Sequence, residues 1–311
     1  MLSRRNFLGV ATFTTAAIGL APRQVFADPE NPVITFHKDA GKAKISITRL
    51  RGNISVLEGS GGNIAVLTGP DGKLLVDAGL SESRRQLSEA LASISRDPVK
   101  HLINSHWHFD HTDGNEWLHG EGATITAHEN TRKHMSVNTR MEIFNFTFPA
   151  APAGALPATV FSEEHKLEFN GVTLVLKKYP SAHTDSDISI EFTDADILHV
   201  GDTWLNGHFP LIDYSTGGSI NGTIQATELN VNRVSEKTIV IPGHGPIGNK
   251  ADLIEYRDML VAVRDKVAAL KKRGLSLNEV IVAAPTAAFD KKWGTWLIDG
   301  KTFTSLVYAG V

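Results

Sequence analysis

The amino-acid sequence is dominated by short apolar runs rich in Ile, Val and Leu, each bounded by Gly, Asn or Asp. Runs of this length and composition are typical of β-strands joined by tight turns. In the first half of the chain, strands are predicted at residues 44–50, 52–59, 62–69, 73–79, 99–105 and 123–128. In the second half, strands are predicted at residues 165–169, 172–179, 187–193, 195–202 and 237–245. The chain therefore has to fold around β-sheets, in two similar halves.

Between and after the strands, the spacing of apolar residues changes to the helical period. In residues 81–96, Leu87, Leu91 and Ile94 fall three or four residues apart, and Ser81 can cap the first turn. Further helices are predicted at residues 129–140, 218–235 and 249–273. This mixture predicts an α/β fold in which two sheets pack face to face with helices outside, although composition alone leaves several folds open.

The N-terminus has the layout of a cleaved export signal. A basic head that contains Arg4 and Arg5 precedes an apolar, Ala-rich run that ends at Ala27. The run is shorter than the roughly 20 residues that span a bilayer, so we expect no stable membrane anchor. The Ser-Arg-Arg-Asn-Phe-Leu head resembles a bacterial twin-arginine signal, with an ordinary secretory signal as the alternative, and predicts a periplasmic or secreted protein. Residues 28–43 are predicted to be a linker, and residues 44–311 the folded domain.

Charge and cysteine content restrict the partners. Cleavage after residue 27 removes three arginines and no acidic residue, so the formal net charge of −3 becomes −6. Such a chain does not attract polyanions, and we expect no nucleic-acid partner. The sequence contains no cysteine, so any metal ion must be held by nitrogen and oxygen atoms.

Residues 103–115, INSHWHFDHTDGN, crowd three histidines and two aspartates at the end of a predicted strand. Side chains two residues apart in a strand lie on one face, so His106 and His108 are expected to hold one ion together. Asp110 and His111 come where the chain turns, and we expect them to point at a second ion nearby. Each ion would then still lack ligands.

Three polar residues further along the chain can complete the two sites. His183 lies between two predicted strands, Asp202 ends a strand, and His244 follows one. The glycines that flank His244 let the backbone come close to a ligand. The remaining histidines are expected to be solvated or core residues: His37, His101, His119, His128, His134, His165, His199 and His208.

The order and spacing of His-x-His-x-Asp-His, a later His, Gly-Asp and Gly-His-Gly resemble those of the metallo-β-lactamase superfamily over roughly residues 44–250. The resemblance implies a four-layer αβ/βα sandwich, two metal ions and a small-molecule substrate. It also implies a role for each residue of the pattern: His106, His108 and His183 as ligands of the first ion; Asp110, His111 and His244 as ligands of the second; Asp202 as the bridge between them; and Asp77 as a residue that orients a ligand histidine.

Two divalent ions with two ligand aspartates leave a positive site, which favours a bound hydroxide near pH 7. We expect a metal-bridging hydroxide, oriented by Asp110 as the catalytic residue, to attack the carbonyl of a small ester, lactone or β-lactam. Zn²⁺ is the expected metal, two ions per chain, and Fe or Mn also suits such ligands.

The substrate stays open, because family members cleave β-lactams, lactones, thioesters, phosphodiesters and sulfate esters. Asp202 disfavours the β-lactamase subclass with cysteine at this position, export disfavours a glutathione thioester, and the acidic net charge disfavours nucleases. The alternatives are a phosphodiesterase- or sulfatase-type hydrolase, and an iron-dependent oxidoreductase that resembles persulfide dioxygenases and holds one iron.

Aromatic residues near the pattern predict an apolar substrate pocket, with a place in the core as the alternative: Trp204, Phe209, Phe144, Phe146 and Phe148. The proline-rich residues 144–161 are expected to form a flap over the site, or else a packed structural loop. Residues 274–311 are expected either to complete the fold or to form a dimer contact.

Overall fold

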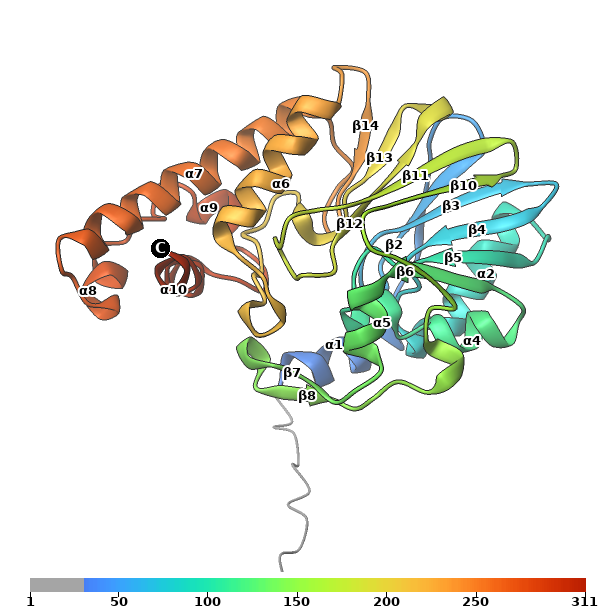
Figure 1. Ribbon diagram of the computed structural model, residues 1–311, viewed down its shortest axis with the longest axis horizontal. Coiled ribbons are helices and arrows are strands. Elements are labelled where there is room, and N and C mark those ends of the chain that lie inside the picture. Colours follow the sequence, from blue (N-terminus) through green and yellow to red (C-terminus); the bar gives the residue numbers. More distant parts are fainter. Residues whose placement is uncertain (1–30) are drawn as a thin grey trace, which may run out of the picture.

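Two β-sheets lie face to face, and helices lie outside both of them (Figure 1). The structure is a computed structural model that describes residues 31–311, so the predicted export signal lies outside the described residues. The four layers confirm the predicted α/β sandwich. Within residues 31–311, no helix combines the length and the apolar character that a membrane crossing requires.

The first sheet has seven strands in the order β1-β2-β3-β4-β5-β6-β9. Neighbours are antiparallel from β1 to β4 and parallel from β4 to β9. Its strands are β1 (Ser46–Arg49), β2 (Ile54–Glu58), β3 (Ile64–Gly69), β4 (Gly72–Val76), β5 (Val99–Ile103), β6 (Thr124–His128) and β9 (Thr159–Phe161).

The second sheet has five strands in sequence order, antiparallel from β10 to β13, with β13 and β14 parallel. Its strands are β10 (Glu164–Phe169), β11 (Val172–Lys178), β12 (Ile188–Phe192), β13 (Ile197–His199) and β14 (Ile239–Ile241). Loops that leave the carboxyl ends of parallel strands are the usual place for a ligand site in α/β proteins.

The inner faces of the two sheets form one apolar core. Val56 and Leu67 of the first sheet and Leu176, Ile190 and Phe192 of the second are all completely buried within it. Alternating apolar residues on each strand place these side chains inward, because the side-chain period of a strand is two. This shared core fixes the position of one sheet relative to the other.

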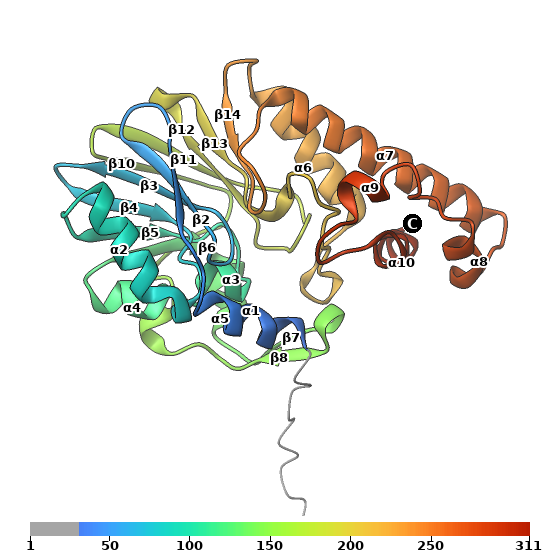
Figure 2. The same cartoon turned by 180° about the vertical axis from the view of Figure 1, so that it is seen from behind.

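Helices cover the outer face of each sheet (Figure 2). The first sheet packs against α2 (Arg84–Ile94) and α4 (Asn115–Gly120). The second packs against α6 (Ile220–Arg233) and α7 (Lys250–Lys272). Residues 274–311 continue this layer, because Phe303 and Trp293 are buried in the same cluster. Their helices are α8 (Leu277–Val282), α9 (Asp290–Trp293) and α10 (Gly300–Gly310). Residues 274–311 therefore complete the fold.

The segment predicted as a linker contains a helix, α1 (Pro32–Ala40). The side chain of Asn31 caps it by accepting a hydrogen bond from the backbone N–H of Val33 at 3.0 Å. Val33 is buried against the core that Trp107 and Phe109 belong to. The prediction was therefore wrong for these residues, although an Asn followed by Pro is a recognisable helix start.

The helix predicted at residues 129–140 is also shorter than expected. It ends at Met135, as α5 (Glu129–Met135), and β7 (Thr139–Met141) then pairs with β8 (Phe146–Phe148) in a two-stranded sheet of its own. The remaining elements are short: α3 (Phe109–Thr112) and the 3₁₀ turns η1 (Ser81–Ser83), η2 (Glu142–Phe144), η3 (Ala153–Ala155), η4 (Thr193–Ala195), η5 (Gly201–Thr203) and η6 (Tyr214–Thr216).

Phe192→Ala should lower the free energy of unfolding by about 3–5 kcal/mol, because it removes a completely buried ring between the sheets and leaves a cavity. Urea unfolding followed by circular dichroism measures the change. Val282→Ala is the control, since Val282 is 84% exposed and should change stability by less than about 0.5 kcal/mol. Equal stability of the two variants would contradict the proposed core.

Candidate metal centre

The four predicted ligands of the 103–115 segment lie in a loop and a short helix. Strand β5 ends at Ile103, His108 precedes α3, and Asp110 and His111 lie within α3. The predicted strand under His106 and His108 is therefore wrong. It ends because the backbone N–H of Ser105 donates to Asp77 Oδ1 at 2.7 Å instead of to a neighbouring strand.

The structure nevertheless brings His106 and His108 together with His183. Their ring centroids lie 4.5–4.9 Å apart, and all three side chains are buried. One nitrogen of each ring is close enough to the others for the three to hold a single ion. The predicted first set of ligands thus forms one cluster.

Hydrogen bonds on the far side of each ring fix which nitrogen is free. His183 Nδ1 donates to the carbonyl of Leu211 at 2.7 Å, and His108 Nε2 donates to Asp213 Oδ2 at 3.2 Å. The remaining nitrogens, His108 Nδ1 and His183 Nε2, then face each other at 2.7 Å, both as lone pairs. The buried Nε2 of His106 has no hydrogen-bond partner at all. Three converging lone pairs without donors are what a metal ion requires, so this donor set fits one.

A second cluster consists of Asp110, His111 and His244. His244 Nε2 lies 3.3 Å from His111 Nε2 and 3.1 Å from Asp110 Oδ2. His111 Nδ1 donates to Asp77 Oδ2 at 2.8 Å, which turns its Nε2 lone pair toward the cluster. This cluster also matches the predicted set.

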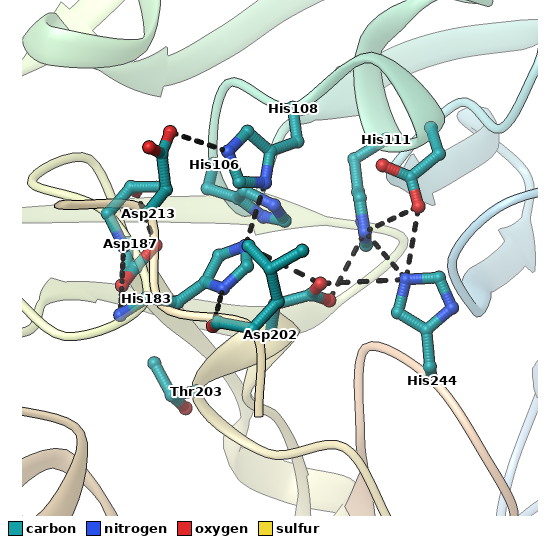
Figure 3. Close-up of polar contacts among 12 residues, drawn as sticks. His106, His108, His111, His183, Asp187, Asp202, Thr203, Asp213 and His244 are labelled. Carbon is teal, nitrogen blue, oxygen red and sulfur yellow. Dashed lines mark hydrogen bonds and ion pairs between the residues drawn. The ribbon is translucent and has the colours of Figure 1, made fainter. Parts of the chain in front are cut away.

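Asp202 lies between the two clusters and reaches both (Figure 3). Its Oδ1 is 3.2 Å from His111 Nε2. Its Oδ2 is 3.5 Å from both His183 Nε2 and His244 Nε2. This is the position that a carboxylate shared by two ions would occupy. A Cβ added at Gly243 would collide with Asp202 Oδ1, so a residue without a side chain is required beside it.

The charges differ between the clusters. Burial and His111 hold the pKa of His106 well below its usual range, and burial and His108 lower the pKa of His183 to about 4. Both rings are therefore neutral, the form that binds metal. Burial alone would lower the pKa of His111, but the carboxylates of Asp202 and Asp110 outweigh it and raise this pKa. The second cluster thus attracts positive charge.

Asp77 connects β4 to both clusters and is completely buried. Its Oδ2 accepts from Ser105 Oγ at 2.7 Å as well as from His111 Nδ1. Because the Ser105 hydroxyl donates to Asp77, it can accept from His106 Nδ1, 3.0 Å away. Asp77 therefore orients His111 directly and His106 through Ser105. The family resemblance implied only that it orients one ligand histidine.

Sequence reasoning missed two buried aspartates that position histidines. Asp213 accepts from His108, and Asp187 Oδ2 accepts from the backbone N–H of His183 at 2.8 Å. Burial raises the pKa of Asp187 to about 7 against the effect of its hydrogen bonds. Asp187 is four residues after His183, so the sequence could have indicated that the two lie close together. Asp213 is brought to His108 only by the fold.

The predicted aromatic pocket is correct only in part. Trp204 and Phe209 are 0% and 1% exposed and belong to the core, which corrects their assignment to the pocket. Phe144 lines the cleft above the clusters, whereas Phe146 packs against Phe148. The sequence missed the other apolar residues that line this cleft: Phe36, Phe109, Met141, Leu205, Leu211, Trp296 and Leu297. Of the predicted flap, residues 144–161, only Phe144 lines this cleft.

Residues 57–244 match the family model of the metallo-beta-lactamase superfamily. The chain belongs to this superfamily. All seven predicted ligands lie within the matched residues. The superfamily consists mostly of metal-dependent hydrolases, and the histidine and aspartate clusters of this chain can hold metal ions.

Solved structures with the same fold include enzymes of different chemistry. The stereoselective inverting sec-alkylsulfatase Pisa1 from Pseudomonas sp. aligns with a TM-score of 0.64 at 15% identity, over 85% of this chain and 50% of the sulfatase. A metallo-beta-lactamase from Pontibacter korlensis aligns with a TM-score of 0.56 at 16% identity, over 70% of this chain and 99% of that one. The DIM-1 metallo-beta-lactamase aligns with a TM-score of 0.55 at 20% identity, over 70% of this chain and 97% of that one. This chain spans about half the length of the sulfatase. At these identities the similarity shows the fold alone.

Asp77→Asn should weaken metal binding about 10- to 100-fold, because an amide has one accepting oxygen and cannot accept both from the Ser105 backbone N–H, now bound by Oδ1, and from His111 and the Ser105 hydroxyl, now bound by Oδ2. Asn tolerates the backbone at this position, where φ is 68°, so the variant should fold normally. Competition with a chromogenic chelator measures the affinity. The matched control, Asp258→Asn, changes an exposed carboxylate and should bind metal like the wild type. Unchanged affinity in Asp77→Asn would disprove its orienting role.

Proposed function

We propose that this chain is a dinuclear, zinc-dependent hydrolase that attacks the carbonyl carbon of a small ester, lactone or β-lactam and breaks its acyl C–O or C–N bond. The observation that carries the proposal is the pair of three-residue clusters that share Asp202. In it, His106, His108 and His183 hold the first ion, and Asp110, His111 and His244 the second. Two divalent ions held there would supply an activated water and a Lewis acid for the carbonyl.

Asp110 is the catalytic residue of the proposal. It lines the cleft, and its carboxylate is the most exposed among the seven proposed ligands, at 12%. Burial raises the pKa of Asp110, but His111 and His244 outweigh this and lower it to about 2. The carboxylate is therefore ionised at neutral pH, and it can accept a hydrogen bond from the attacking water and orient it.

The cleft supports an uncharged, weakly polar substrate. Apart from the proposed ligands, the residues that line it are apolar: Phe36, Phe109, Met141, Phe144, Leu205, Leu211, Trp296 and Leu297. None of its lining residues is Lys or Arg, so no cationic side chain is in place to bind an anionic group of a substrate. This favours neutral esters and lactones over sulfate and phosphate esters.

A substrate screen on the protein without residues 1–27 tests the proposal. The panel comprises an aryl ester, a homoserine lactone, a chromogenic β-lactam, a thioester, a bis-aryl phosphodiester and an aryl sulfate, each with and without chelator. We expect chelator-sensitive cleavage of the ester or the lactone. Cleavage of the sulfate or phosphodiester alone would replace the carbonyl proposal with its alternatives. We propose the periplasm as the location, because of the export signal predicted in residues 1–27.

Asp110→Asn should lower kcat/KM on the best substrate by roughly 10²–10⁴-fold, the range expected for loss of a positioned proton acceptor. Steady-state kinetics at saturating Zn²⁺ measures the loss. Asp265→Asn serves as the control, because its carboxylate lies on the exposed side of α7 and should leave the rate unchanged. Near-normal turnover in Asp110→Asn would rule out this role for Asp110.

A further inference from the structure

The cleft above the two clusters is too small to hold an organic substrate. Its volume is about 20 Å³, which is little more than one water molecule needs. A second cavity of about 200 Å³ lies beside it. Phe109 lines both cavities, and the next residue in the chain is Asp110. Phe109 is therefore the residue that the site of reaction shares with a much larger space.

The walls of the second cavity are mainly apolar and aromatic. Phe109 stacks on Phe148 with ring centroids 5.1 Å apart, and Trp107 meets Phe148 edge-on at 5.7 Å. The rest of the apolar lining consists of Met135, Pro149, Ala150, Ala151, Pro152 and Ala155, and the polar lining residues are Thr112, Asp113, Glu116 and His134. An apolar cavity of about 150 Å³ is enough to bind benzene. The cavity is therefore of a size to take a phenyl ring or a short alkyl chain.

We propose that this second cavity is the subsite for the apolar group of the substrate. The enzyme then prefers esters or lactones that carry an aryl group or a short alkyl chain. The inference rests on the proposed function, because it takes the reacting carbonyl to lie at the metal cleft. Phe109 is the residue around which the substrate passes from one cavity to the other.

One wall of the second cavity, at Phe148, belongs to the separate two-stranded sheet of β7 and β8. Phe148 ends β8, and β7 and β8 pair only with each other, away from both large sheets (Figure 1). A two-stranded ribbon of this kind has little stability of its own. The ring of Phe109 is held between Phe148 and His37, on which it also stacks, at 5.4 Å. A small shift of β8 together with a turn of Phe109 would join the two cavities.

A series of p-nitrophenyl esters from acetate to octanoate tests the subsite on the metal-loaded enzyme. Burial of one methylene contributes about 0.8 kcal/mol, so kcat/KM should rise about fourfold for each methylene until the cavity is full. Ala155→Phe fills the cavity, since Ala155 lines it and is 5% exposed. It should lower the hexanoate-to-acetate ratio of kcat/KM at least tenfold. Ala92→Phe, on the exposed side of α2, is the matched control and should keep the wild-type ratio.

Met135→Ala is the second variant, and it keeps the test decisive should Ala155→Phe not fold. It enlarges the cavity, so the preferred ester should be longer by one or more methylenes. The proposal is overturned if both variants keep the wild-type dependence on chain length. It is equally overturned if the wild type shows no such dependence.

Binding of compounds that cannot be hydrolysed separates this inference from the proposed function. If the wild type cleaves no ester or lactone, the proposed function fails, and the cavity is then tested with linear ketones. Calorimetry should show that 2-heptanone binds the metal-loaded protein more tightly than acetone does, and that Ala155→Phe removes this difference. Equal binding of the two ketones by the wild type would refute the subsite.

Discussion

The burial of five imidazoles and two carboxylates in one place is the constraint on which the rest of this structure depends. Such groups are costly to remove from water unless each polar atom finds a partner. The structure provides partners on the outer side of the rings, through Asp77, Asp213 and the carbonyl of Leu211. On the inner side it leaves lone pairs that face one another. Lone pairs that face one another repel unless positive charge lies between them. Metal ions can supply that charge, so this donor set fits them.

The sandwich brings these groups together from distant parts of the chain. His106, His108, Asp110 and His111 follow β5 of the first sheet, whereas His183, Asp202 and His244 come from loops of the second. The apolar core between the sheets, which includes Phe192, sets the distance between these two groups of loops. Rigid packing therefore orients the proposed ligands, and preorganisation of this kind is what a metal centre needs.

The sequence predicted the strands and the seven proposed ligands because both depend on local patterns, namely apolar runs between turn residues and a motif with fixed spacing. It failed where tertiary contacts override those patterns. The sequence predicts a strand under His106 and His108, but this strand ends earlier because the backbone N–H of Ser105 donates to Asp77. Trp204 was placed in the pocket, but the fold buries it completely. The carboxylate of Asp213 reaches His108 from 105 residues away, and Trp296 packs against His244 from the segment between α9 and α10, so no local signal could reveal either residue.

The count of metal ions per chain tests the central claim most directly. Mass spectrometry with inductively coupled plasma on protein purified without added chelator gives the identity and number of the ions. The account predicts two zinc ions per chain in the wild type. It also predicts one in each of the variants His183→Ala and His244→Ala, which remove a ligand from different clusters. A single iron per chain, or the loss of both ions from His244→Ala but none from His183→Ala, would contradict it.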